Sequence, residues 1–506
     1  MSDWTTQRAD GECQKLEEHL LSDRDLVIAA NRAPITFHHS ADGSLVYTRG
    51  SGGLVTALTG LARNVKATWI GCALTDEDRE WQSGEISFAP GSEPLTIHFI
   101  NADQQSYDDY YNVIANPLLW FLQHNMMDTA TNPTIDLTTW NAWENGYLAV
   151  NRLFADTIVQ YIRESQRKTL VMLQDYQLYA VPKFIRQQHP PRKKYTLMHF
   201  VHIPWPGTED WGILPAGMRR TILEGLCSVD LLGFQIREDG LNFIRTVNNY
   251  LPRAHVNFRK GKIWFRNHMT YVRDFPISID VDALRSTAAT DVVKEYQRVL
   301  GRLLRDRKLI LRIDRIEPSK NIVRGFQAMG DLLERHPQYI GQVQFLALLV
   351  PSRLAVSEYQ TYLGDMMAAA GSVNARFGMP DWEPVRIMVG ENYPRAVAAM
   401  KMYDALLVNS VADGMNLVAK EGPVVNERDG IVILSERTGA RQQLEPGALI
   451  ISPVDIYATA EAIHQALGMP SDERKERADR LRWIVEREDI NAWICAQLQA
   501  IQSLGL

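Results

Sequence analysis

The residues from Asp413 to Glu421 have types and a spacing that could bind an anion or a sugar. They follow an apolar run at residues 404–410, which is typical of a buried parallel strand. An Asp413-Gly414 turn comes next, followed by a helical pattern, so several backbone N–H groups would point at one place. Glu421 lies about two helical turns further on and could reach a second part of a long ligand, such as a ribose. An ordinary strand–turn–helix corner fits the same local pattern.

Two cations follow another apolar run, at residues 309–313. Arg315 has a planar fork of donors and Lys320 a compact charge, and together they suit two oxygens of a diphosphate. Fixed cations beside a departing diphosphate stabilise the charge that develops on it. A solvated charged loop is the alternative interpretation.

The amino-terminal half has a comparable pair of features. Arg32 ends the first apolar run, and Gly50 to Leu54 form a glycine-rich start to an apolar helix. Such a start lets backbone amides approach a phosphate closely, although it is also common in plain turns.

The elements that must position these residues alternate between strand and helix, which predicts an α/β protein with parallel sheets. A helix is marked by apolar residues at helical spacing between Trp143 and Ile162, and a hairpin is expected around residues 257–272. Residues 471–506 are expected to be helical throughout. The predicted strands are 26–30, 68–71, 95–100, 170–173, 195–200, 231–234, 309–313, 343–349, 387–389, 406–408 and 431–434.

We therefore predict two doubly wound, Rossmann-like domains, an amino-terminal one at 1–280 and a second at 281–485. The helix at 486–506 is expected to pack back on the first domain through Trp493, Leu498 and Ile501. Two such sheets facing a central cleft indicate a glycosyltransferase B-type (GT-B) fold, with ligands at the carboxyl ends of the strands. Periodicity alone also fits epimerases, phosphorylases and two-domain binding proteins.

Composition narrows the class of protein. The chain has 506 residues and a net charge of −6, so no basic field indicates a nucleic-acid binder. No apolar run approaches the roughly 20 residues that span a bilayer, and the polar start lacks a signal-peptide core. The 4 cysteines are scattered, as expected for reduced thiols. These features predict a cytoplasmic protein with small-molecule ligands and no nucleic-acid or membrane partner, and leave a homo-oligomer open.

Several segments, taken in order, closely resemble motifs of the trehalose-6-phosphate synthase family of retaining glycosyltransferases. They are the Asp413–Glu421 loop, the Arg315/Lys320 segment, Arg32 with the glycine loop, Tyr111 and Trp120 after Tyr107, Gln174–Leu178, His202–Pro206 and Arg353. The resemblance runs from about Leu26 to about Leu504 and implies transfer of glucose from a nucleoside-diphosphate glucose to glucose 6-phosphate. The product would be α,α-trehalose 6-phosphate. The donor would be either UDP-glucose or GDP-glucose.

The resemblance also assigns roles to individual residues. On the donor side, Arg315 and Lys320 would neutralise the diphosphate, and Glu421 would hold the ribose. His202 and the loop would hold glucose, with Gly53 at the junction of donor and acceptor. On the acceptor side, Asp175 would orient the attacking hydroxyl, and Arg32, Tyr111, Trp120 and Arg353 would hold the phosphate. We take Asp175, His202, Arg315, Lys320 and Asp413 as the catalytic set, and the donor loop as Asp413, Gly414, Met415, Asn416, Leu417 and Val418.

We expect neither a cofactor nor a metal. Asp280-Val281-Asp282 has the Asp-x-Asp form that can hold a divalent cation, but its place before a helical pattern favours an N-cap. The motifs contain no obvious carboxylate nucleophile, which favours front-face attack with the leaving phosphate accepting the proton.

Several positions depart from the family pattern, namely Gln174, Ser278, Asn321, Ala412 and the pair Gly422-Pro423. Gln174 stands where the family has a histidine, and Gly422-Pro423 interrupts what is usually a continuous helix. The departures keep three alternatives open: a glucosylglycerol-phosphate synthase, a pseudo-glycosyltransferase that joins cyclitol units, and a non-catalytic regulatory subunit.

Overall fold

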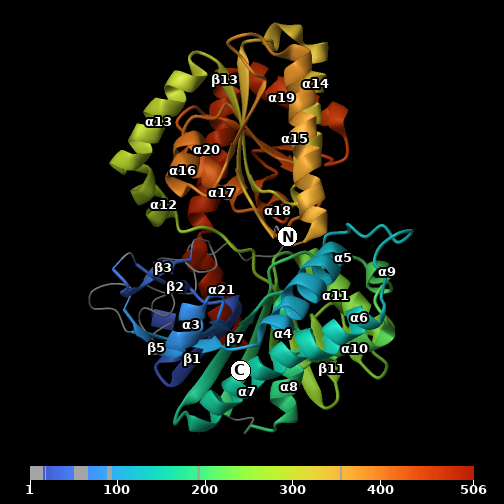
Figure 1. Cartoon of the computed structure of the whole chain (residues 1–506). Helices are drawn as coiled ribbons and strands as arrows, with labels where there is room; N and C mark the ends of the chain where they lie inside the picture. The colour runs from blue at the N-terminus through green and yellow to red at the C-terminus, as the bar shows by residue number, and fades with distance from the viewer. Residues whose placement is uncertain are drawn as a thin grey trace. The chain divides into compact units, whose positions relative to one another are not determined.

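The computed structural model describes residues 15–16, 19–40, 42–50, 67–87, 94–190, 194–353 and 356–506. The chain divides into two compact units (Figure 1). Unit 1 comprises residues 1–276 and 491–506, and unit 2 comprises residues 277–490. Within the described ranges, no helix is long and apolar enough to cross a membrane.

Unit 1 is built on a ten-stranded sheet in the order β10-β11-β12-β9-β8-β7-β1-β4-β6-β5. The strands from β12 to β6 in that order are parallel to their neighbours, and β5, β10 and β11 add antiparallel edges. A separate hairpin joins β2 and β3. The strands are β1 (Arg24–Arg32), β2 (Ile35–His39), β3 (Leu45–Arg49), β4 (Ala67–Cys72), β5 (Ser83–Ile86), β6 (Leu95–Ile100), β7 (Lys168–Gln174), β8 (Tyr195–Val201), β9 (Leu231–Phe234), β10 (His255–Asn257), β11 (Lys262–Phe265) and β12 (His268–Asp274).

The core of unit 1 is rich in aromatic side chains from the helical segments that pack on this sheet. β7 and β8 are apolar and buried along almost their whole length because helices cover both faces of a parallel sheet. The helical segments are α3 (Asp76–Trp81), α4 (Gln104–Asp108), η1 (Asp109–Trp120), α5 (Phe121–Gln123), α6 (Leu137–Asn141), η2 (Ala142–Leu148), α7 (Ala149–Glu164), η3 (Tyr176–Leu178), α8 (Val181–Gln187), α9 (Thr208–Trp211), α10 (Ala216–Leu226), α11 (Arg237–Tyr250) and α21 (Ile490–Ser503).

Unit 2 is a six-stranded parallel sheet in the order β15-β14-β13-β16-β17-β18. Figure 1 shows α14, α15 and α19 on one side of this sheet and α13, α16, α17 and α20 on the other. The elements are α12 (Val281–Ala288), α13 (Asp291–Leu304), β13 (Lys308–Arg315), η5 (Pro318–Lys320), α14 (Ile322–Arg335), η6 (Pro337–Tyr339), β14 (Val343–Val350), α15 (Ser357–Phe377), β15 (Val385–Val389), α16 (Tyr393–Met400), β16 (Ala405–Val408), α17 (Val418–Val425), β17 (Ile431–Ser435), α18 (Arg441–Leu444), β18 (Leu449–Ile451), α19 (Ile456–Gly468) and α20 (Ser471–Arg487).

The eleven predicted strands all form, as does the hairpin, which is β10–β11 with β12 beside it. The expectation of continuous helix from residue 471 onward is wrong, because α20 ends at Arg487 and α21 begins at Ile490. The expectation of reduced thiols holds for Cys72 and Cys227, which are free and buried, but is wrong for Cys495, which is disulfide-bonded. As expected, Asp280 caps a helix: its carboxylate accepts from the N–H of Ala283 at the start of α12.

Candidate functional site

In unit 2 the candidate residues gather where the strand order reverses. From β13 the chain builds outward to β14 and β15, then returns to the other side of β13 with β16. Open parallel sheets bind ligands outside the carboxyl ends of the two strands at such a switch point. Arg315 is the last residue of β13, and the Asp413 loop follows β16. The topology therefore brings together two motifs that lie about a hundred residues apart in sequence.

Lys320 and Asp413 form an ion pair across this switch point. Their Nζ and Oδ2 atoms lie 2.5 Å apart, and both side chains are mostly buried. Burial opposes the charged ammonium, but the carboxylates of Asp413 and Asp314 outweigh it and raise the pKa of Lys320. Asp413 also accepts from Ser410 Oγ at 3.3 Å and from Asn416 Nδ2 at 3.1 Å. Lys320 is thus held cationic and fixed in place at the strand ends.

Glu317 joins the two candidate arginines of this unit. Its carboxyl oxygen Oε1 lies 3.1 Å from Arg315 Nη1 and 3.6 Å from Arg353 Nη1, and the Glu317 side chain is fully buried. Ser352 Oγ donates to the same oxygen at 3.1 Å, and Arg353 Nη1 donates to Tyr359 Oη. A buried carboxylate therefore orients both guanidinium groups, one from the end of β13 and one from the segment after β14.

The backbone of the donor loop is set by Asn416, which has a φ of 70°. Asparagine tolerates this left-handed conformation better than most residues. Its Oδ1 accepts from the N–H of Ala419 at 3.3 Å, and so caps the first turn of α17. Gly414, Met415 and Asn416 are buried, whereas Asp413, Leu417 and Val418 are partly exposed.

Glu421 lies on α17, and its Oε1 accepts from Tyr393 Oη at 3.2 Å. Burial raises the pKa of Glu421 to about 7, although the hydrogen bond from Tyr393 acts in the opposite direction. The neighbouring Lys420 is buried and donates from Nζ to the Ile277 carbonyl at 2.6 Å. Glu421 can therefore change charge near neutral pH at the point where a ribose hydroxyl is expected.

The structure accounts for two of the departures from the family pattern. Asn321 replaces a glycine and has a φ of 59°, and its Nδ2 donates to the carbonyls of Asn409 and Pro453. The helix α17 continues through Gly422 and Pro423 to Val425. A Cβ at Gly422 would lie 2.6 Å from Cδ2 of the buried Leu406 on β16, so any larger residue would force a shift in the packing there.

In unit 1 the strand order reverses between β1 and β7. The chain builds from β1 to β4 and β6, then crosses to β7, β8 and β9 on the other side. Arg32 ends β1 and Asp175 follows β7, so both residues stand at this second switch point. His202 follows β8, the next strand along.

Asp175 has a backbone conformation that is rare outside glycine, with φ 70° and ψ 179°. Such a conformation costs about 1–3 kcal/mol and persists only where the surroundings impose it. Its N–H donates to the Phe200 carbonyl at 2.7 Å, and its own carbonyl lies 3.0 Å from His199 Nε2. The carboxylate Oδ1 accepts from the N–H of His202 at 3.1 Å. Asp175 and His202 are thus brought together by contacts between the ends of β7 and β8.

The imidazole of His202 lies between two glutamines. Nε2 is 2.9 Å from Gln174 Oε1, and Nδ1 is 3.4 Å from Gln235 Nε2. Burial, with a smaller contribution from His199, lowers the pKa of His202 to about 3. The ring is therefore neutral at physiological pH, with the proton on Nε2 directed at Gln174 and the lone pair of Nδ1 facing the amide of Gln235. Gln174, a departure from the family pattern, has a definite structural partner.

The remaining candidates of unit 1 lie among aromatic side chains. Tyr111 stacks on Tyr107 with ring centroids 5.6 Å apart and planes at 13°. Arg32 is exposed at the end of β1. Burial raises the pKa of Tyr107, and the positive charge of Arg32 offsets a smaller part of that rise. Trp120 is only 5% exposed and stacks on His124 at 4.0 Å. The phosphate role of Trp120 stays a prediction, and Gly53 lies outside the described residues.

Sequence reasoning missed three residues that hold the candidates in place. They are Glu317 between the arginines, Gln235 beside His202, and Tyr393 beside Glu421. Gln235 had the same signal that marked other candidates, because it is a polar residue directly after a buried strand, β9. Glu317 and Tyr393 had no comparable signal in the sequence.

Two doubly wound parallel sheets, each with polar side chains at its switch point, define an α/β enzyme of the glycosyltransferase B type. The model of Glycosyltransferase family 20 matches residues 24–503, and the chain belongs to this family. An α,α-trehalose-phosphate synthase (UDP-forming) of Botryotinia fuckeliana is 32% identical over 94% of this chain and 88% of the relative. A trehalose-6-phosphate synthase of Mycolicibacterium paratuberculosis is 31% identical over 95% of this chain and 96% of the relative.

Two solved structures are similar over almost the whole chain. The E. coli trehalose-6-phosphate protein bound with UDP-2-fluoro glucose has a TM-score of 0.81 at 27% identity, covering 95% of this chain and 98% of that one. The α,α-trehalose-phosphate synthase from Burkholderia xenovorans in complex with glucose-6-phosphate has a TM-score of 0.80 at 27% identity, covering 95% and 100%. The predictions of the family, of the GT-B fold and of a glycosyltransferase are confirmed.

Proposed function

We propose that the protein transfers glucose from UDP-glucose to the anomeric hydroxyl of glucose 6-phosphate, giving α,α-trehalose 6-phosphate with retention at the donor carbon. The observation that carries the proposal is the chemistry of the two solved relatives. One is bound with UDP-2-fluoro glucose and the other with glucose-6-phosphate, and both match this chain over nearly its full length. The UDP-forming names of the fungal relatives favour uridine over guanosine.

The geometry of unit 2 supports a diphosphate role for its cations. Arg315 is anchored on a buried carboxylate, and Lys320 is held cationic beside Asp413. As the bond between the donor carbon and the phosphate oxygen breaks, these fixed charges would stabilise the negative charge that develops on the diphosphate. Glu421 would accept from the ribose, and the buried loop residues after Asp413 would offer backbone N–H groups to glucose.

In unit 1, the neutral His202 supports a positioning role rather than acid–base work. With a pKa near 3 it cannot supply a proton at neutral pH, and Gln174 and Gln235 already fix its tautomer. The proton of the attacking hydroxyl would pass to the departing phosphate oxygen, so that bond formation and proton transfer occur on one face of the sugar. Asp175 would orient the acceptor, and Arg32, Tyr111, Trp120 and Arg353 would hold its phosphate.

The test incubates purified protein with UDP-glucose or GDP-glucose and either glucose 6-phosphate or glycerol 3-phosphate, and measures released nucleoside diphosphate. We expect release of nucleoside diphosphate with UDP-glucose and glucose 6-phosphate. In Arg315→Ala the rate of this release should fall about 10²–10³-fold. Arg298→Ala removes an exposed guanidinium on α13 and should leave the rate unchanged. No release with glucose 6-phosphate and any glucose donor would refute the proposal, and release with glycerol 3-phosphate alone would select the glucosylglycerol-phosphate branch.

We further propose that the protein acts in the cytoplasm, in keeping with the free, buried thiols of Cys72 and Cys227.

A further inference from the structure

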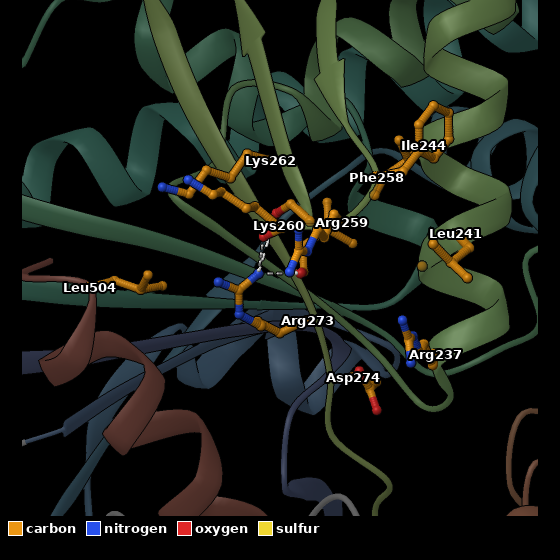
Figure 2. Close-up of a pocket in the computed structure, with 13 residues that line it drawn as sticks. Arg237, Leu241, Ile244, Phe258, Arg259, Lys260, Lys262, Arg273, Asp274 and Leu504 are labelled. Carbon is orange, nitrogen blue, oxygen red and sulfur yellow. Dashed lines mark hydrogen bonds between the residues drawn. The ribbon is translucent and has the colours of Figure 1, made fainter. Parts of the chain in front are cut away.

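A cavity of about 680 Å³ lies in unit 1, between the start of α11 and the hairpin formed by β10, β11 and β12 (Figure 2). The family resemblance assigns none of the residues that line it. Five of its lining side chains are cationic and one, Asp274, is acidic, which gives the lining a net charge of +4 in a chain whose net charge is −6. The five cations are Arg237, Arg259, Lys260, Lys262 and Arg273.

These cations line one cavity without a matching set of carboxylates. Among the described residues, none of the five has a carboxylate within ion-pair distance, and Glu238, next to Arg237, pairs with Arg245 instead. Arg273 Nη1 donates to the carbonyls of Lys260, Gly261 and Val272, which places its guanidinium against the loop that carries Arg259 and Lys260. Like charges around one cavity repel one another, and an anion bound among them would be attracted to all of them.

The cavity also has an apolar part. Leu241 and Ile244 on α11, Phe258 after β10 and Leu504 near the carboxyl terminus line it together with the cations, as Figure 2 shows. Phe258 is 42% exposed, which is unusual for a phenylalanine and leaves its ring available as a stacking surface. The size lies within the range of small-molecule sites, roughly 300–1,000 Å³.

We propose that this cavity binds a small organic polyphosphate, with the phosphoryl groups among the five cations and an aromatic or apolar moiety against Phe258 and Leu241. A nucleoside triphosphate has the matching chemistry, since it joins several negative charges to a planar ring. The surrounding cations favour charge-assisted hydrogen bonds to phosphoryl oxygens, and arginine forms them through two donors at once.

The position of the cavity links it to the His202 loop. Asp239, in the first turn of α11, accepts from the N–H of Trp205, and Asn242 donates to the Trp205 carbonyl. Gln235, just before α11, contacts the His202 ring. A ligand seated on the first turns of α11 would therefore bias the segment that carries His202. This coupling to turnover rests on the function proposed above, whereas binding at the cavity does not.

Binding is measured by isothermal titration calorimetry of the full-length protein with ATP, inorganic triphosphate and adenosine. We expect ATP to bind at least fivefold tighter than inorganic triphosphate, and adenosine to bind at least a hundredfold more weakly than ATP. The double variant Arg259→Ala/Lys260→Ala should weaken ATP binding at least tenfold. The matched control Lys475→Ala/Arg480→Ala removes two exposed cations from α20 and should change it less than twofold. Phe258→Ala should remove the preference for ATP over inorganic triphosphate.

A nucleotide could also enter the donor site, and Arg315→Ala distinguishes the two. We expect this variant to keep ATP binding within twofold of the wild type. Loss of binding in Arg315→Ala with retention in the Arg259/Lys260 variant would overturn the proposal, as would tighter binding of an acidic peptide or a single-stranded oligonucleotide than of ATP. Saturating ATP should also change the rate of nucleoside diphosphate release at least twofold in the wild type but not in the Arg259/Lys260 variant. An unchanged rate alongside intact ATP binding would overturn only the coupling through α11.

Discussion

The strained backbone of Asp175 can be tested by comparing the stabilities of two variants, Asp175→Gly and Asp175→Ala. Its φ of 70° and ψ of 179° lie in a region that glycine populates readily and other residues avoid. Asp175→Ala and Asp175→Gly both remove the carboxylate that accepts from the N–H of His202, which costs about 1–3 kcal/mol in each case. Only the glycine variant also removes the strain.

The difference between these two variants isolates the strain. Glycine gains about 1–3 kcal/mol from relief of strain and loses about 0.5–1 kcal/mol because its unfolded chain is more flexible. From the middle of these two ranges, about 2 and about 0.75 kcal/mol, we expect Asp175→Gly to be more stable than Asp175→Ala by about 1 kcal/mol. For a unit of this size, 1 kcal/mol corresponds to about 2 °C in Tm, so the glycine variant should unfold about 2 °C higher.

Differential scanning calorimetry of both variants measures this difference, with Asp365 as the control position. Asp365 is exposed on the regular helix α15, where alanine should be more stable than glycine by about 1 kcal/mol. Both Asp175 variants should lose transfer activity by about a hundredfold or more, because neither can orient the acceptor hydroxyl. Equal or lower stability of Asp175→Gly relative to Asp175→Ala would refute the reasoning, since the backbone would then carry no strain.

Three further predictions concern other residues. Glu317→Gln keeps the shape of the side chain but removes the buried charge that orients Arg315 and Arg353, so kcat/KM should fall at least tenfold. The control Glu334→Gln removes a charge from an exposed ion pair with Arg376 and should change kcat/KM less than twofold in the same assay. In the folded chain the pKa of His202 and that of His199 are both about 3, whereas an unfolded histidine has a pKa of about 6.5. Below pH 6.5 the unfolded state therefore binds more protons than the folded state. The free energy of unfolding should fall as the pH drops, by up to about 1.4 kcal/mol per pH unit for each histidine. Urea unfolding at pH 4.5 and pH 7 should show a smaller difference in His202→Gln than in the wild type, and an equal difference would contradict the lowered pKa. Gly422→Ala should destabilise the protein by about 1–3 kcal/mol because its Cβ would lie 2.6 Å from Leu406 Cδ2. Gly364→Ala, in open space on α15, should instead stabilise it, and thermal unfolding of the two variants compares them directly.

The sequence predicts the elements well because each has a local cause. Buried parallel strands such as β7, β8 and β14 are apolar along nearly their whole length, so the runs at 170–173, 195–200 and 343–349 locate them without knowledge of their neighbours. The break between α20 and α21 was missed because Glu488 and Asp489 do not interrupt a polar helical pattern. The short strand β18 was missed because three residues carry too little periodicity.

The candidate residues themselves were recognisable from their types and from the segments that resemble a known family. Arg315, Lys320 and the Asp413 loop each follow an apolar run, and Asp175 and His202 do the same in the first half. What the sequence could not supply was their grouping, because a strand's neighbours in a sheet depend on contacts distant in sequence. Glu317 is an example, because nothing in the sequence distinguishes a glutamate two residues after an arginine. Its role is visible only in the folded chain, where β14 and the segment after it bring Arg353 to the same carboxylate as Arg315.

By itself, then, the sequence determined the α/β class, the family and the chemical types that serve a nucleotide sugar and a sugar phosphate, since local patterns and motif order encode all three. Only the tertiary structure decided which of those residues meet. Reversal of strand order between β13 and β16 and between β1 and β7 creates the two places where they gather. The packed surroundings then set their states, a neutral His202, a cationic Lys320 and a strained Asp175, because burial and neighbouring charges act through space and not along the chain.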